Sequence, residues 1–179
     1  MPSTSANPIA NLNYLNPTGF AMVIDRLPNV TFFCQDVTVP GFSANNPQQP
    51  NPFSRIPLPA DFPDNENLSL SFMVDEDLEG WKQLFQWYVG ITFPETHQQY
   101  KALLNQEGVN PGSDKNLYST ISILVYTSHK NPKFKFTFHD AVPVSLSGIP
   151  LSVNTGDIGP VTCQAIFDYS YFTFEVLNP

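Results

Sequence analysis

Several stretches of the chain alternate apolar and polar residues with the two-residue period of a β-strand. In LSLSFMVD, at residues 68–75, Leu68, Leu70 and Phe72 fall on one face and serines on the other. In KFKFTFHD, at residues 133–140, three phenylalanines share one face and two lysines and a threonine share the other. Both patterns predict strands with one buried face.

The spacing of the apolar runs predicts how the strands connect. YSTISILVYT (118–127) and the run at 133–140 are joined by SHKNP, which predicts a hairpin. FAMVID (20–25) and VTFFCQDVTV (30–39) flank RLPN and predict a first hairpin. The last run, VTCQAIFDYSYFTFEV (161–176), predicts one long strand that crosses between sheets or pairs with a neighbouring molecule.

The pattern changes to a helical period in the middle of the chain. Asp75 is predicted to be the N-cap, with Glu76 and Asp77 in the first turn and Gly90 as the C-terminal stop. The apolar stripe that predicts this helix, over about 75–89, consists of Leu78, Trp81, Leu84, Phe85 and Tyr88, and its aromatic members are expected to lie in the core. A shorter second helix is predicted over Glu95–Gln106.

The acids Asp75, Glu76 and Asp77 admit a second interpretation, because paired carboxylates serve general acid–base catalysis and hard-metal binding. No calcium-loop spacing and no nearby His/Glu pair supports it, so a capping role is favoured. Trp87 falls off the apolar stripe. It either packs under the loop that follows or is exposed as an anchor for a neighbouring molecule.

The proline-rich segment 41–66 does not have the composition of a central strand, because proline cannot donate to a strand ladder. It is expected to be an extended arm, loop or edge ribbon. Residues 1–19 are expected to be an N-terminal extension of a single domain that spans 1–179. The predicted fold class is mainly β (α+β), a β-sandwich or partly closed barrel with one flanking helix.

Composition narrows the possible chemistry. Charged residues make up 13% of the chain and the net charge is −8, which argues against a cationic nucleic-acid footprint. The candidate metal ligands and nucleophiles lie far apart in sequence, without motif spacing, and are His97, His129, His139, Cys34 and Cys163. We therefore expect two packed thiols, no catalytic residues, no metal and no cofactor, and we expect that the protein is not an enzyme.

The chain has no apolar stretch of about 18 residues and no signal-peptide pattern near its start, so no membrane partner and synthesis in the cytoplasm are expected. Its surface is expected to consist largely of Asn, Gln, Ser and Thr, because charged residues are scarce.

Three segments, taken in order, resemble the tail tube family of contractile-tailed bacteriophages. They are FAMVIDRLPNVTFFCQDVTVPGF (20–42), LSLSFMVDEDLEGWKQLFQWYVG (68–90) and CQAIFDYSYFTFE (163–175). Within that family, VDEDLEGW, QWYVG and CQAIFDYSYFTFEV look most like the tube terminators, or tail completion proteins, of T-even-type myoviruses. The resemblance covers most of residues 20–176.

The resemblance implies a tail-tube-like sandwich or split barrel that assembles as a ring of six in the virion tail, built in the host bacterial cytoplasm. A terminator caps the head-proximal end of the tube, and its partners are the tail tube protein, the sheath terminator and neck proteins. Double-stranded DNA would pass without specific binding through a lumen that the net acidity suggests is acidic. The alternatives are a tube subunit, a baseplate-side tube initiator or, more remotely, a virion binding module that holds carbohydrate through exposed aromatics such as Trp87.

Overall fold

The computed structural model describes residues 14–44, 46–59, 63–92, 95–104, 117–153 and 159–177. Most of the predicted N-terminal extension, residues 1–13, lies outside the described residues. In chain order the helices and strands are β1 (Phe20–Ile24), α1 (Pro28–Phe33), β2 (Cys34–Thr38), β3 (Phe42–Ala44), β4 (Gln48–Pro50), β5 (Arg55–Pro57), β6 (Pro63–Asn65), β7 (Leu68–Met73), α2 (Glu79–Thr92), α3 (His97–Leu104), β8 (Ser119–Tyr126), β9 (Pro132–Leu146), β10 (Thr162–Asp168) and β11 (Tyr171–Val176).

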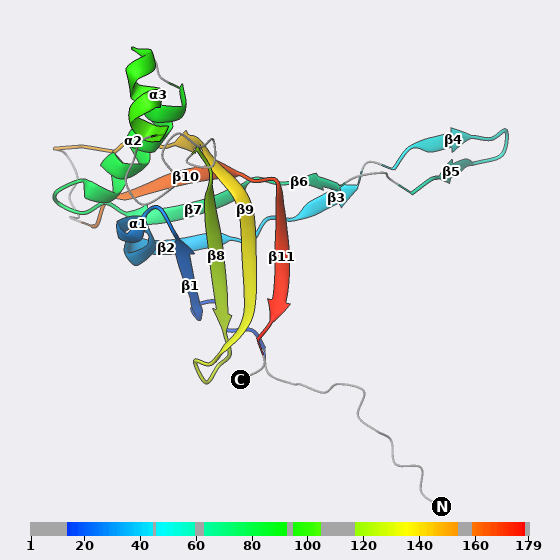
Figure 1. Cartoon of the computed structure of the whole chain (residues 1–179). Helices are drawn as coiled ribbons and strands as arrows, with labels where there is room; N and C mark the ends of the chain where they lie inside the picture. Colours follow the sequence, from blue (N-terminus) through cyan, green and yellow to red (C-terminus); the bar gives the residue numbers. More distant parts are fainter. Residues whose placement is uncertain are drawn as a thin grey trace, which may run out of the picture.

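Seven strands form one antiparallel sheet in the order β1-β8-β9-β10-β7-β2, and β11 pairs with β9 off this path. The sheet folds into two layers because β9 belongs to both. We call β1, β8, β11 and the first part of β9 sheet A, and β2, β7, β10 and the last part of β9 sheet B. Figure 1 shows the strands of sheet A running side by side, with β7 and β10 crossing their direction.

Strand β9 changes layers near Asp140. It pairs with β11 up to His139 and with β10 from Val142 onward. The exposed Asp140 between them has a φ of 55°, a left-handed conformation that is uncommon for a residue other than glycine. This backbone bend lets one strand of 15 residues serve two sheets.

The core lies between the two layers and is closed at one end by the helices. Sheet B contributes Leu68, Leu70 and Phe72 from β7, each at most 1% exposed. Sheet A contributes Ile121 from β8 and Phe138 from β9, both fully buried. The prediction of a mainly β fold with few helices is confirmed, as are the half-buried strand at 68–75 and the hairpin of β8 and β9.

The predicted first hairpin is wrong, because helix α1 separates the two strands and places them in different layers. Pro28 occupies the first turn of α1, where its missing N–H costs nothing. Leu27 and Val30 are buried, and the Thr31 hydroxyl donates to the Leu27 carbonyl at 3.0 Å. Burial of this short helix outweighs the β-strand propensity of its sequence.

The last apolar run crosses between the sheets as expected, but it does so as two strands instead of one. Strand β10 pairs in sheet B and β11 pairs in sheet A. Between them Tyr169 is buried and the Ser170 amide donates to the His139 carbonyl at 3.1 Å. The corner therefore has its own packing and hydrogen bonding, which ends the first strand.

Candidate assembly surfaces

Of the three acids, only Asp75 caps the helix, which begins four residues later than predicted. The carboxylate of Asp75 accepts hydrogen bonds from the backbone N–H groups of Glu79 and Gly80, at 3.1 and 3.3 Å. Leu78 has a φ of 57° and ends the turn that precedes α2. The capping role is confirmed for Asp75, while Glu76 and Asp77 lie in an exposed turn outside the helix.

The buried face of α2 is rotated from the predicted apolar stripe. Gly80, Leu84, Trp87 and Gly90 are its buried residues, whereas Phe85 is 44% exposed. Trp81 lies half-buried and stacks on Phe85, with ring centroids 5.1 Å apart, and its indole N–H donates to Ser147. The prediction that the aromatic stripe lies in the core was therefore wrong at Phe85, while Trp81 and Tyr88 are half-buried. Leu78, at the start of the stripe, is 40% exposed.

Trp87 is a core residue. Its indole N–H donates to the carbonyl of Leu117 at 3.0 Å, and its ring lies 5.9 Å from that of Phe167. Only 2% of it is exposed. Trp87 therefore packs in the core and bonds to Leu117, which follows the two helices in the chain. A carbohydrate-binding module would need an exposed Trp87, so this alternative loses its support.

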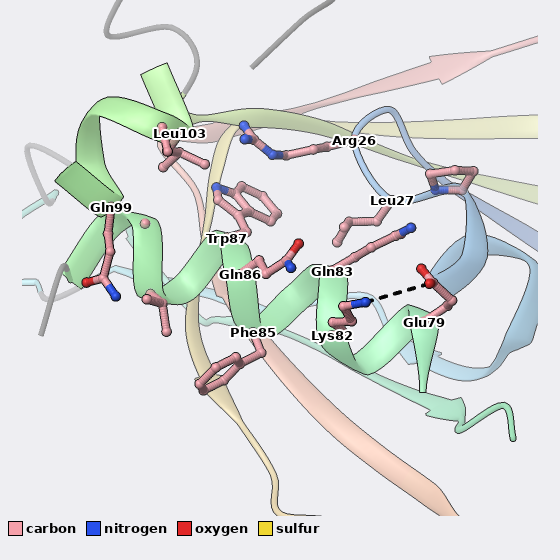
Figure 2. A pocket seen from close by; sticks show the side chains of 14 residues that line it. Arg26, Leu27, Glu79, Lys82, Gln83, Phe85, Gln86, Trp87, Gln99 and Leu103 are labelled. Carbon is pink, nitrogen blue, oxygen red and sulfur yellow. Dashed lines mark ion pairs between the residues drawn. The ribbon is translucent and has the colours of Figure 1, made fainter. Parts of the chain in front are cut away.

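Gly90 lies within α2, which continues to Thr92, so the prediction of a glycine stop is wrong. A β-carbon at Gly90 would lie 2.9 Å from two side-chain carbons of Leu103 in α3. The absence of a side chain lets the two helices approach closely (Figure 2). The second helix, α3, is confirmed over His97–Leu104, and the two residues that were predicted to follow lie outside the described chain.

A pocket of about 810 Å³ opens between α2, α3 and the start of α1. Figure 2 shows Arg26 and Trp87 on one side of it, and the guanidinium carbon of Arg26 lies 5.3 Å from the Trp87 ring centroid. Burial lowers the pKa of Arg26 from its ordinary value. Gln83, Gln86 and Gln99 also line this pocket, together with the Glu79–Lys82 ion pair and several apolar side chains. Its lining therefore combines amide, charged and apolar groups.

Sheet A ends in two edge strands, because among the described residues β1 pairs only with β8 and β11 pairs only with β9. The Leu177 amide donates to the Lys133 carbonyl at 2.7 Å. Since antiparallel residues alternate, Val176 directs its backbone groups to the open edge. On β1 the Ile24 amide also points away from β8 but donates to the Thr31 hydroxyl at 2.9 Å.

On β9 and β11, the face of sheet A that points away from the core is largely polar. Across β9 and β11, Lys135 lies opposite Glu175 and Thr137 lies opposite Thr173. The next pair, His139 and Tyr171, stacks with ring centroids 4.6 Å apart. The cross-strand pairs therefore include one of opposite charge and two without formal charge.

Residues from the proline-rich segment extend the β2–β7 pairing into a narrow arm. Strand β3 pairs with β6, and farther out β4 pairs with β5. Figure 1 shows the arm projecting from the side of the body opposite the helices. At its base the Glu66 carboxylate accepts from the Gly41 amide at 3.1 Å, and at its tip Phe53 is 96% exposed.

The three histidines, which the sequence analysis weighed as metal ligands, lie on different elements of the fold. His97 stacks on Tyr100, His139 stacks on Tyr171, and His129 lies exposed in the turn between β8 and β9. In the described part of the chain, no three residues among His, Cys, Asp and Glu lie together as metal ligands. Likewise, no described helix is long and apolar enough to cross a bilayer.

The two thiols are free and pack within the fold. Cys163 is buried, with its sulfur 3.7 Å from the Gly148 carbonyl. Cys34 is half-buried, and burial raises the pKa of its thiol to about 11. A thiol with so high a pKa is almost wholly protonated at neutral pH and is a poor nucleophile.

Comparison with solved structures gives the same fold. The tube-terminating cap of the anti-feeding prophage has a TM-score of 0.63 at 11% identity, covering 98% of this chain and 99% of the cap. In an extracellular contractile injection system, PVC, a sheath–tube chain matches with a TM-score of 0.57 at 12% identity, over 98% of this chain and 100% of that chain. The PVC sheath/tube terminator matches at 0.56 and 13% identity, over 92% and 99%.

No curated protein sequence is similar enough to the chain to count as a match. The sequence profile of the phage tail tube proteins matches residues 6–175, which is most of the chain. That family is a structural one, not a family of enzymes, and its proteins belong to the tail of the virion. The chain therefore belongs to the phage tail tube protein family.

Proposed function

We propose that this protein forms a ring in the tube of a contractile phage tail and caps the tube at its head-proximal end. The observation that carries the ring is the pair of open edges of sheet A, on β1 and β11. An exposed strand edge is a ready partner for another strand. A contact between unlike edges is heterologous, and such contacts produce a ring when the rotation closes.

Strand direction supports this closure. The β1–β8, β8–β9 and β9–β11 pairs are all antiparallel, so β1 and β11 run in opposite directions. A neighbouring copy's β1 placed beside β11 continues the alternation, and a ring of six copies forms one continuous antiparallel sheet. This arrangement satisfies the open backbone groups of both edges.

The remaining surfaces are assigned to the other tail components. The arm is about 13 residues long on each side, or about 40 Å at the rise of a strand, which reaches beyond one subunit to an adjacent ring of tube protein. Its exposed Phe42, Phe53 and Ile56 supply apolar contacts. The ring's free end meets the sheath terminator and neck proteins, and DNA passes through the central channel. Assembly takes place in the host cytoplasm.

Electron microscopy of the purified protein tests the proposal. Discrete rings that bind the ends of preformed tubes are the expected result. The variant Val176→Pro removes an open-edge N–H without removing a β9 partner, so it should remain folded by circular dichroism and form no rings. Val176→Thr keeps the N–H and serves as the matched control. Rings that form equally well with both variants would exclude the β11 edge as the ring contact.

A tube subunit or tube initiator is the second candidate, because the matching family is described as tail tube protein and the cap and tube structures above fit the chain similarly. The position at the end of the tube rests on the sequence resemblance of VDEDLEGW, QWYVG and CQAIFDYSYFTFEV. The same microscopy separates the candidates. Long tubes of the purified protein alone would replace the cap with the tube subunit.

A further inference from the structure

Closing sheet A into the proposed ring determines which of its faces lines the channel. One face packs against sheet B and the helices, in a core that joins Ile123 and Phe138 of sheet A to Phe167 of sheet B and Trp87 of α2. A layer of this thickness fits only on the outside of a closed cylinder. The opposite face of β1, β8, β9 and β11 is then the channel wall.

Near the β8–β9 turn, each subunit contributes to this wall one cation and one anion at directly opposite positions on β9 and β11, namely Lys135 and Glu175. Apart from Lys133 and Asp25 at its two ends, the other residues that alternate onto this face carry no formal charge, and they include Ala21, Val23, Ser122, Leu124, Thr137, His139, Tyr171 and Thr173. Each copy in the ring therefore adds a balanced pair.

The two ends of the wall carry opposite charges, which cancel in the sum over the whole wall. At the β8–β9 turn lie Lys130 and Lys133, and at the opposite end the exposed Asp25 and Asp140 lie on either side of β8. Together with Lys135 and Glu175, these make three cations and three anions, a net charge of zero in a chain whose net charge is −8. The described acids not counted here lie outside the strands of sheet A, in β2, in the arm and at its base, at or before α2 and α3, and in β10.

We infer that the channel wall is charge-balanced rather than acidic, and that Glu175 is the residue that keeps it so by offsetting Lys135. This inference rests on the proposed ring and changes the expectation of an acidic lumen. At the level of Lys135 and Glu175, polyanionic DNA would meet neither a ring of unbalanced lysines that holds its phosphates nor a ring of unbalanced acids that repels it. The hydroxyls of Thr137 and Thr173 leave that wall hydrated.

The test compares assembled rings of wild type and Glu175→Gln in a gel-shift assay with short linear double-stranded DNA at low salt. Removing the carboxylate exposes one unbalanced lysine per copy, so Glu175→Gln rings should bind DNA about tenfold more tightly than wild type, with an affinity that falls as salt rises. Lys135→Gln with Glu175→Gln restores the balance and should return binding to the wild-type level.

Glu79→Gln is the matched control, because it removes the same charge from an exposed site on α2, where Glu79 lies 3.9 Å from Lys82. It should leave DNA binding unchanged. Equal binding by the Glu79 and Glu175 variants, no gain with Glu175→Gln, or tight binding by wild-type rings would each overturn the inference. If Glu175→Gln does not assemble, the charge swap K135E with E175K replaces it, and its rings should behave as wild type. Absence of rings from the wild-type protein would instead contradict the proposed function.

Discussion

The ribbon that starts as β2 and β7 behaves differently in the body and in the arm. In the body, β7 pairs with β10 and buries Leu68, Leu70 and Phe72 in the core. In the arm, every described residue of β3, β4 and β5 is exposed. The same antiparallel pairing thus forms with and without burial, and only the first part has a hydrophobic contribution to its stability.

This difference predicts that the protein loses most stability when a core side chain of the body is removed, and we expect the largest loss at Trp87. Trp87→Ala removes a ring that is 2% exposed and should lower the free energy of unfolding by about 3–5 kcal/mol. Urea denaturation followed by circular dichroism measures this. Trp87→Phe retains most of the volume and loses the hydrogen bond to Leu117, so its cost should be about 1 kcal/mol. Equal losses in both variants would show that packing is not the main term.

Close packing between α2 and α3 gives the next largest effect. Gly90→Ala places a methyl group 2.9 Å from Leu103 carbons and should cost about 1–3 kcal/mol of unfolding free energy. Gly80→Ala is the matched control in the same helix, because its methyl group would meet Val30 at an ordinary 3.6 Å. That variant should be neutral or gain up to about 1 kcal/mol from helix propensity. A stabilising Gly90→Ala would contradict the close contact.

The cap of α2 contributes less than either packing site. Asp75→Ala leaves the amides of Glu79 and Gly80 without their acceptor and should lower the free energy of unfolding by about 1 kcal/mol. Glu76→Gln and Asp77→Asn change exposed acids and should stay within about 0.5 kcal/mol. Thermal melts of the three variants give the comparison. A larger loss of stability from Asp77→Asn than from Asp75→Ala would indicate that Asp77, not Asp75, caps the helix.

The arm should show the smallest effect on stability. Phe53→Ala removes a side chain that is 96% exposed, so the melting temperature should not change and the free energy of unfolding should shift by less than about 0.5 kcal/mol. Binding of the rings to tube ends should weaken, because this side chain is proposed to pack on the adjacent ring. Cosedimentation with preformed tubes measures that binding. A clear drop in melting temperature would mean that the arm's tip contributes to the fold of the subunit itself.

The sequence predicts those parts of the fold that local pattern determines. The alternation in β7 and the turn between β8 and β9 were enough to place both strands. For α2 the pattern was ambiguous, because Leu84 and Trp87 fit one buried face while Trp81 and Phe85 fit another, and contact with sheet B decides between them. The left-handed Leu78, which delays the helix start, has no signal in composition.

The candidate assembly surfaces depended more on topology than on motif. The capping role of Asp75 could be predicted because it is local. The open edges of β1 and β11 could not, because they depend on which strands lie inside the sheet. The pairing of Lys135 with Glu175 likewise depends on the register between β9 and β11. In the chain, the part of β9 in sheet A is separated from β11 by the end of β9 and by β10, which belong to sheet B.

The Thr31 hydroxyl has a mechanical consequence for the proposed ring. By accepting the outward amide of Ile24, it removes the last donor from the open edge of β1 and leaves Phe20 and Met22 as the free positions there. A neighbouring strand can pair with an edge only where backbone N–H groups are free, so the free positions limit the possible registers. In the proposed ring, helix α1 thus limits how far the neighbouring β11 can extend along β1 and fixes the strand register of each contact between subunits. Identical contacts give the ring a channel of uniform width.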